Sequence, residues 1–166
     1  MQKIVYFNHG KESGPNGSKI QAMAEVAHTQ GYLVESPNYS GMKDPQQRVA
    51  KLLSLRPAAE RLVLVGSSMG SYVATQASQS LQVDGLFLLA PAFYIPEYGE
   101  PAPPPKARHC TIVHGWNDEL IPVGKIYQYA QQYQIPLHIL ADGHRLTEKI
   151  TSICQLFAAF LMQLEK

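Results

Sequence analysis

The feature that most constrains this chain is an aliphatic run that leads directly into a serine flanked by glycines. Leu62 to Val65 are four consecutive aliphatic residues, which is typical of a strand buried on both faces of a parallel sheet. Gly66 to Gly70 follow with the sequence GSSMG, which fits the pattern G-x-S-x-G with Ser68 at its centre. Apolar residues then recur at helical spacing, at Val73, Ala74, Ala77 and Leu81. This succession predicts a sharp strand-to-helix turn with Ser68 at its apex.

The two glycines of the pattern have a steric role. In a turn this tight, a side chain at Gly66 or Gly70 would collide with the neighbouring strand or helix. Ser68 itself would occupy a strained backbone conformation, which costs roughly 1–3 kcal/mol and is tolerated where it holds the hydroxyl out into a cleft. The alternative is a glycine-rich connector inside an ordinary α/β domain, in which Ser68 has only a structural role.

Length and composition indicate an ordinary globular protein. The 166 residues suffice for one domain with one sizeable core, and the 45% hydrophobic and 16% charged residues are typical values. The formal net charge is +1 and no long run carries one sign, so we expect neither nucleic acid nor a membrane surface as a partner. The N-terminal apolar run is too short for a signal peptide. Cys110 and Cys154 are expected to be reduced core thiols, and we therefore predict a cytoplasmic protein.

The remaining strands and helices alternate along the chain. Further strands are predicted at Lys3–Asn8, Tyr32–Ser36, Gly85–Ala90, His109–His114 and Pro136–Ala141. Strands separated by helices pair in parallel through right-handed crossovers and carry helices on both faces. The pattern therefore predicts a six-stranded parallel sheet in a single α/β domain.

Several helix boundaries carry characteristic residues. Ser18 is predicted to cap the first helix, and Gly31 to end it. Asp44 and Pro45 are typical of a helix start, with a cap followed by proline at the first helical position. Pro122 is expected to open another helix. The last helix is predicted from apolar residues in steps of three and four, at Leu146, Ile150, Ile153, Phe157, Phe160 and Leu164.

Chemically active side chains follow the predicted strands, where ligands of such sheets bind. Ser68, Asp118 and His144 each follow a different strand, and they occur in that order along the chain. A serine, an acid and a histidine in this order are expected for a catalytic triad built on a turn of this type. The other residues at the strand ends include His9, Lys11, Phe93, Tyr94 and Trp116.

These segments resemble the α/β-hydrolase family, and in particular the compact YqiA-type bacterial esterase-like proteins. The matching segments are Asn8 to Gly10, Gly66 to Gly70, His114 to Asp118 followed by Ile121-Pro122, and Gly143-His144. The resemblance covers nearly the whole chain. It implies one trimmed α/β-hydrolase domain over residues 1–166, without the usual N-terminal antiparallel strands. It also implies a sheet order of 2-1-3-4-5-6, counted along the chain.

The resemblance further implies a mechanism. Ser68 would attack an acyl carbonyl, His144 would accept its proton, and Asp118 would orient the imidazole. The backbone N–H groups of Met69 and Lys11 would form the oxyanion hole.

Two other acids lie close to these residues in the chain. Asp142 precedes His144 by two positions and is expected to bond to its own backbone as a turn former. Glu119 follows Asp118 directly and is expected to point elsewhere. Asp118 is therefore the predicted third member of the triad.

The substrate pocket is expected to include the side chains of His9, Phe93, Tyr94 and Trp116. His9 could instead fix its own loop by hydrogen bonding, and Trp116 could simply cover the end of the sheet. Residues 91–108 contain six prolines, which argues against a helix or an inner strand. We interpret this segment as a short, stiff flap beside the cleft, with a plain surface crossover as the alternative.

The sequence thus predicts a serine hydrolase, a carboxylesterase or thioesterase acting on a small-molecule acyl ester. No cofactor is expected, and no metal, because His28, His109 and His138 lack the spacing of metal ligands. We expect a monomer or a small homo-oligomer. The alternative function is that of a binding or interaction protein of the same fold with an idle triad. A flavodoxin-like nucleotide binder is disfavoured, because Lys11 to Pro15 fits a phosphate-binding turn poorly.

Overall fold

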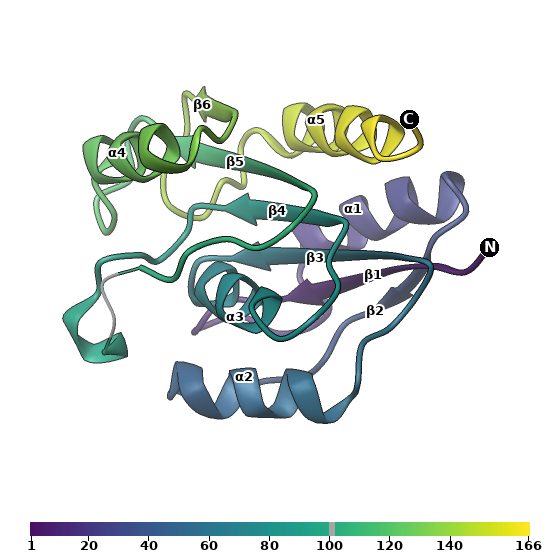
Figure 1. The fold of residues 1–166 in the computed structure, drawn as a ribbon. Helices are drawn as coiled ribbons and strands as arrows, with labels where there is room; N and C mark the ends of the chain where they lie inside the picture. Colours follow the sequence, from purple (N-terminus) through teal and green to yellow (C-terminus); the bar gives the residue numbers. More distant parts are fainter. Residues whose placement is uncertain (100–101) are drawn as a thin grey trace.

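A parallel β-sheet forms the centre of the molecule in the computed structural model, which describes residues 1–99 and 102–166 (Figure 1). Within this part of the chain the sheet has six strands in the order β2-β1-β3-β4-β5-β6, all paired in parallel. The strands are β1 (Lys3–Asn8), β2 (Leu33–Glu35), β3 (Arg61–Ser67), β4 (Gly85–Leu89), β5 (His109–Gly115) and β6 (Leu137–Leu140). The predicted fold class and strand order are confirmed.

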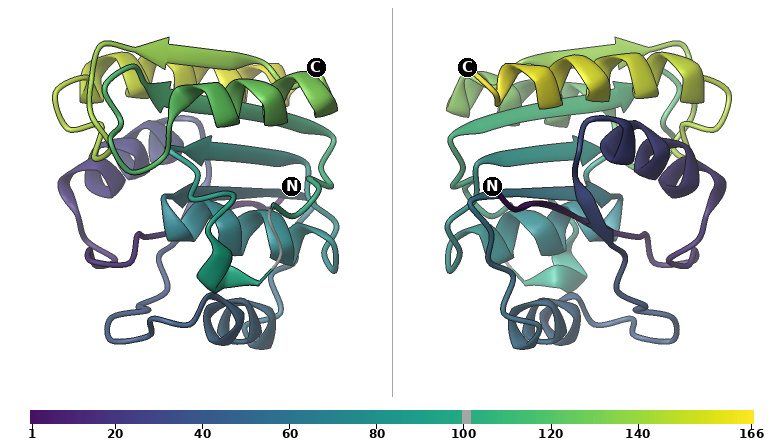
Figure 2. Two further views of the ribbon diagram at one scale, coloured as in Figure 1. Left: turned by 90° about the vertical axis from the view of Figure 1, so that its left-hand side faces the viewer. Right: turned by 90° about the vertical axis from the view of Figure 1, so that its right-hand side faces the viewer.

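Helices cover both faces of this sheet, so the molecule has three layers (Figures 1 and 2). One face carries α1 (Ser18–Thr29) and α5 (Ile150–Gln163), and the other carries α2 (Pro45–Ser54), α3 (Met69–Ser78) and α4 (Val123–Tyr133). Successive residues of a strand point to opposite faces. In β3, Val63 and Val65 pack towards α1 and α5, whereas Leu62 and Leu64 pack towards α2 and α3. The aliphatic run before Ser68 is therefore buried on both sides.

Two helix ends follow from their sequences as predicted. The carboxylate of Asp44 accepts a hydrogen bond from the N–H of Gln46 at 2.9 Å and caps α2, an interaction that stabilises a helix by about 1 kcal/mol. Gly31 has a φ of 85° just beyond α1, and the N–H of Tyr32 bonds back to the carbonyl of Ala27 at 3.0 Å. This is a Schellman motif, in which glycine is favoured because its φ is positive.

Two other predicted helix ends are wrong. Ser18 does not cap α1; the capping position is Gly17, which has extended backbone and offers no side chain, and Ser18 is already helical. Leu146 does not belong to α5, which begins only at Ile150. Leu146 is nevertheless fully buried in the core on the α1 and α5 side, in a loop conformation with a φ of 53°.

The proline-rich segment 91–108 connects β4 to β5 over the α3 and α4 side. Its described residues contain one short 3-10 helix, η1 (Pro96–Tyr98), where the sequence predicted no helix. Proline suits this place because it has no N–H to leave unpaired at a helix start. The hydroxyl of Tyr129 donates to the carbonyl of Pro103 at 2.7 Å and ties the segment to α4. Pro101, one of the six prolines, lies outside the described residues.

Candidate active site

Ser68 occupies the turn between β3 and α3, and its backbone is strained. Its φ is 55° and its ψ is −116°, a region that residues other than glycine rarely adopt. Two hydrogen bonds hold the turn: the N–H of Ser68 donates to the carbonyl of Leu89 at 2.9 Å, and the N–H of Ala92 donates to the carbonyl of Ser68 at 3.1 Å. The strand that follows β3 in the chain therefore fixes a conformation that costs roughly 1–3 kcal/mol.

The glycines on either side permit close backbone contacts. A Cβ added to Gly66 would collide with the backbone of Gly70 and Ser71. A Cβ added to Gly70 would collide with the carbonyl group of Asn8, at the end of the neighbouring strand β1. The steric role predicted for both glycines is confirmed.

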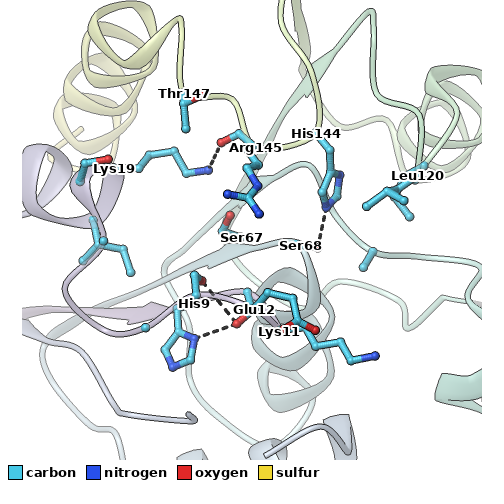
Figure 3. A pocket seen from close by; sticks show the side chains of 18 of the residues that line it. His9, Lys11, Glu12, Lys19, Ser67, Ser68, Leu120, His144, Arg145 and Thr147 are labelled. Atoms are coloured by element: carbon cyan, nitrogen blue, oxygen red, sulfur yellow. Dashed lines mark hydrogen bonds between the residues drawn. The ribbon is translucent and has the colours of Figure 1, made fainter. Parts of the chain in front are cut away.

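Ser68, His144 and Asp118 form a chain of hydrogen bonds, of which Figure 3 shows the one between Ser68 and His144. The Oγ of Ser68 lies 2.8 Å from the Nε2 of His144, and the Nδ1 of His144 lies 2.7 Å from the Oδ2 of Asp118. An ionised carboxylate can only accept, so Nδ1 carries the proton and donates to Asp118. Nε2 is then the acceptor for the hydroxyl proton of Ser68. The three side chains come from the loops after β3, β5 and β6.

The loops that carry Asp118 and His144 are bonded to each other. The N–H of Asn117 donates to the carbonyl of Asp142 at 3.0 Å. A Cβ on Gly115 would collide with that same carbonyl, so the close approach of the two loops requires a glycine there. This contact brings Asp118 and His144 together although they are 26 positions apart.

Asp118 is a buried acceptor that receives several donors. The N–H groups of Leu120 and Ile121 donate to its Oδ1 at 2.9 and 2.8 Å. Burial by itself raises the pKa of this carboxyl, but the hydrogen bonds from His144 and from the Ile121 N–H outweigh burial, so its pKa lies below the usual range. Asp118 is therefore ionised at neutral pH and can stabilise a positive charge on His144.

The two other acids point elsewhere. The Oδ1 of Asp142 accepts from the N–H of Gly143 at 2.7 Å, and its Oδ2 accepts from the N–H groups of Glu148 and Lys149, each at 3.0 Å. Asp142 thus bonds to its own loop and to the residues just before α5. Glu119 is exposed. Among the three candidate acids, Asp118 is the one bonded to His144.

The two backbone groups expected to form the oxyanion hole lie directly after Ser68 and directly after Gly10. Met69 is the first residue of α3, where an N–H has no acceptor within the helix. Gly10 lies against the turn, since a Cβ built on it would be 3.6 Å from the Cβ of Ser68. The next N–H along, that of Lys11, makes no hydrogen bond within the described part of the chain. Both groups are thus available as donors.

A cavity of about 520 Å³ opens beside Ser68 and His144 (Figure 3). Its charged lining comes from Lys11, Glu12, Lys19 and Arg145. The Nζ of Lys19 donates to the carbonyl of Arg145 at 2.6 Å, and burial lowers the pKa of Lys19 to about 8. Its apolar lining comes from Ile20, Ala92, Ile95, Tyr98, Leu120 and Ile121. The cavity therefore combines an apolar wall with a charged rim next to the serine hydroxyl.

Comparison with known proteins identifies the family. A sequence model of the uncharacterised protein family UPF0227 matches residues 3–102. The chain belongs to UPF0227. A crystal structure of a proposed hydrolase of the α/β superfamily from Xanthomonas campestris pv. campestris is 34% identical, with a TM-score of 0.87 over 98% of this chain and 99% of that one. No curated protein matches the chain.

More distant solved structures share the fold of this UPF0227 protein. Est1E from Butyrivibrio proteoclasticus is 16% identical and superposes with a TM-score of 0.82, over 98% of this chain and 88% of that one. An esterase from Pyrococcus furiosus is 15% identical, with a TM-score of 0.76 over 98% and 82% of the two chains. At this level of identity the likeness shows the fold alone. The UPF0227 chain has the α/β-hydrolase fold and is similar in structure to hydrolases, an esterase among them.

The structure corrects the expected pocket lining of this UPF0227 protein. His9 borders the cavity, but Phe93, Tyr94 and Trp116 are not part of its lining. Phe93 is buried against Tyr129 of α4, with ring centroids 4.4 Å apart, and Trp116 is 60% exposed. Tyr94 has a φ of 62° and packs, partly buried, against the hydrophobic core on the α2–α4 side of the sheet.

The wall that Phe93 and Tyr94 were expected to form comes from their neighbours. Ile95 and Tyr98, in the same proline-rich segment, line the cavity instead. The segment therefore walls one side of the cleft as the flap interpretation held, but through different side chains. Positive φ at a tyrosine leaves no signal in the sequence, so this turn could not be foreseen.

Two buried residues beside the site were not assigned to it from the sequence. The Nε2 of His114 lies 2.8 Å from the carbonyl of Ile121 and 3.4 Å from the Oδ2 of Asp118, and burial lowers the pKa of His114. Its place four residues before Asp118 was the available signal. Arg48 of α2 is fully buried and bonds to the loop that carries Gly10. Nothing in the helix pattern around Arg48 distinguishes it from a solvated arginine.

The described residues contain no helix long and apolar enough to cross a membrane. The two cysteines are free thiols that pack on opposite faces of the sheet, Cys110 on the α4 side and Cys154 on the α5 side.

Proposed function

We propose that this protein is a serine hydrolase that cleaves small acyl esters or thioesters through an acyl-enzyme. The observation that carries the proposal is the hydrogen-bonded chain from Ser68 through His144 to Asp118, set on a strained turn at the edge of a cavity. Strain of this kind is retained where it positions a reactive group. The α/β-hydrolase fold and the likeness to a proposed hydrolase of that superfamily support such a reaction but leave the substrate open.

The first half of the reaction forms the acyl-enzyme. The Oγ of Ser68 attacks the acyl carbon while its proton passes to the Nε2 of His144. Asp118 holds the imidazole through Nδ1 and stabilises the cation that results. The carbonyl oxygen becomes an oxyanion, which the N–H groups of Met69 and Lys11 would receive; one such donor contributes about 3–4 kcal/mol to transition-state stabilisation. The intermediate then collapses, and the leaving alcohol or thiol takes the proton from His144.

The second half releases the acid. Water enters where the leaving group was, gives its proton to His144 and attacks the acyl carbon. The new oxyanion occupies the same donors, and collapse breaks the bond to Ser68, whose Oγ recovers the proton from His144. No further reagent is needed, since water is the second substrate.

The proposal is tested with a fluorophosphonate probe, which reacts with activated serines. We expect wild-type protein to be labelled at Ser68, the Ser68→Ala variant to remain unlabelled while keeping its fold, and the Ser67→Ala variant to be labelled still. Labelling of Ser68→Ala at this site would remove the assigned nucleophile. A folded wild-type protein that neither reacts with the probe nor hydrolyses any ester of a broad panel would instead favour a binding protein with an idle triad.

A further inference from the structure

Arg48 is a fully buried arginine that makes no ion pair with a carboxylate within 4 Å in the described part of the chain. Its guanidinium bonds to main-chain carbonyl groups. Nε donates to the carbonyl of Met42 at 2.7 Å, Nη1 donates to that of His9 at 2.8 Å, and both Nη atoms lie 3.3 Å from the carbonyl oxygen of Gly10. The guanidinium also lies over the ring of Tyr39, 5.2 Å from its centre. All its acceptors are thus carbonyls of two loops.

A buried guanidinium without a counter-ion is unusual, because removing a charge from water is costly unless it is paired or fully hydrogen-bonded. An apolar side chain of similar length would fill the same space in α2 without that cost. Here the planar fork of donors matches the carbonyls of His9 and Gly10, which are consecutive residues. The arrangement therefore fixes the loop of His9 and Gly10, which borders Ser68, and ties it to the loop that carries Met42.

A second side chain binds the carbonyl of Gly10. The N–H of Tyr39 donates to the Nε2 of His9 at 2.8 Å, so Nε2 is the acceptor and Nδ1 carries the proton. The Nδ1 of His9 lies 2.8 Å from the carbonyl oxygen of Gly10 and donates to it. Arg48 and His9 thus both donate to the same carbonyl oxygen.

Peptide geometry carries this constraint to the cavity. In a planar trans peptide the C=O and the following N–H point in opposite directions, and the described chain contains no cis peptide. The carbonyl of Gly10 points to Arg48, so the N–H of Lys11 points away from Arg48. Gly10 and Lys11 line the cavity, whereas Arg48 does not. Gly10 also lies close to Ser68, since a Cβ built on it would be 3.6 Å from the Cβ of Ser68.

We infer that Arg48 is a positioning residue: by holding the carbonyls of His9 and Gly10, it aims the N–H of Lys11 at the oxyanion that forms during attack by Ser68. The inference rests on the proposed function, because the oxyanion exists only if Ser68 is acylated. The positive charge also polarises the Gly10–Lys11 peptide, which makes its N–H a stronger donor. Arg48 itself touches no substrate.

The test compares three variants in hydrolysis of a short activated ester. Arg48→Met keeps an unbranched apolar stem and removes the guanidinium donors, so we expect kcat to fall about 100-fold with KM changed less than about twofold, as for a donor used only in the transition state. Arg48→Lys keeps the charge but not the fork, and should recover part of the loss. Leu52→Ala is the matched control: Leu52 is fully buried in the same helix, and its removal should lower stability but leave kcat near the wild-type value.

Four results would overturn the inference. Two concern Arg48→Met: a folded variant with wild-type kcat, or one in which KM changes and kcat does not. The third is a fall of kcat in Leu52→Ala equal to that in Arg48→Met. The fourth applies if Arg48→Met does not fold, and is a wild-type kcat in Arg48→Lys. Amide NMR of wild-type protein gives a measurement without any substitution: the Lys11 amide resonance should shift when a phosphonate occupies Ser68, and an unchanged resonance contradicts the account. If wild-type protein does not react at all, the proposed function fails first and the inference with it.

Discussion

Asp118 and Asp142 are two carboxylates on neighbouring loops, and the donors that bond to each carboxylate distinguish their roles. Asp118 accepts from the Nδ1 of His144, whereas Asp142 accepts from backbone N–H groups before α5. We predict that Asp118→Asn lowers kcat about 10⁴-fold, because an amide favours the wrong tautomer of the imidazole. Asp142→Asn should cost far less activity and act mainly on the stability of its loop. The kcat of both variants is measured in an esterase assay at fixed pH. A larger fall of kcat in Asp142→Asn than in Asp118→Asn would transfer the orienting role to Asp142.

His9 and His114 predict how stability depends on pH. Burial lowers the pKa of both imidazoles. For His9, the hydrogen bond to Gly10 opposes this shift, and repulsion from Arg48 and Lys51 adds to it. Below about pH 6.5 the unfolded chain therefore takes up protons that the folded chain does not. The free energy of unfolding keeps its full value above that pH and decreases as the pH drops below it.

Urea titrations at a series of pH values measure this dependence. The wild-type protein should lose stability progressively between about pH 6.5 and 5, and His9→Asn should lose less over the same interval. His28→Asn, at an exposed position of α1, is the control for removing one imidazole. A stability that stays constant throughout this interval contradicts the prediction.

At the scale of single elements, the β3–α3 turn depends on contact between backbones. Gly70→Ala would drive a Cβ into the carbonyl of Asn8, so we predict a loss of at least about 2 kcal/mol in the free energy of unfolding. Gly124→Ala in α4 is the matched control. A Cβ there meets nothing within 4 Å, so this exchange should be neutral or stabilising by up to about 1 kcal/mol. Equal effects of the two exchanges in thermal or urea unfolding would refute the steric account of the turn.

Elements formed by local rules could be predicted from the sequence. Each of these elements depends on a few consecutive residues: the strands, the cap at Asp44, the end of α1 at Gly31 and the turn between β3 and α3. The order of the strands was implied by the resemblance to a family. The alternation of strands and helices predicts parallel pairing but does not say which strands are neighbours in the sheet. The chain order of serine, acid and histidine then located the three residues that the structure brings together.

What could not be predicted depends on residues distant in the chain or on backbone turns without a sequence signal. Arg48 meets Gly10 across 38 positions, and an arginine on an amphipathic helix is usually solvated. Leu146 and Tyr94 adopt positive φ although neither is glycine or asparagine. Leu146 was therefore assigned to the wrong element, and Phe93 and Tyr94 to a wall of the cavity that Ile95 and Tyr98 form.

At the scale of the whole molecule, the cavity limits the substrate. It is assembled from loops after different strands and holds about 520 Å³, with an apolar wall supplied in part by the short proline-rich segment. Such a wall favours acyl chains of about two to six carbons. Each CH₂ group adds up to about 0.8 kcal/mol to binding when it is buried against apolar surface, and further CH₂ groups beyond the wall add nothing. We predict that kcat/KM across p-nitrophenyl esters peaks in this range. A maximum at palmitoyl length would show that another surface takes the chain.

The central claim is that Ser68 carries the acyl group, and intact-mass spectrometry after rapid acid quenching tests it most directly. Wild-type protein mixed with a short activated ester should gain the mass of one acyl group, and peptide mapping should place that group on Ser68. The His144→Ala variant should acylate far more slowly, and Ser68→Ala should not gain the mass at all. An acyl group mapped to any other residue, or ester turnover that persists in Ser68→Ala, would contradict the account.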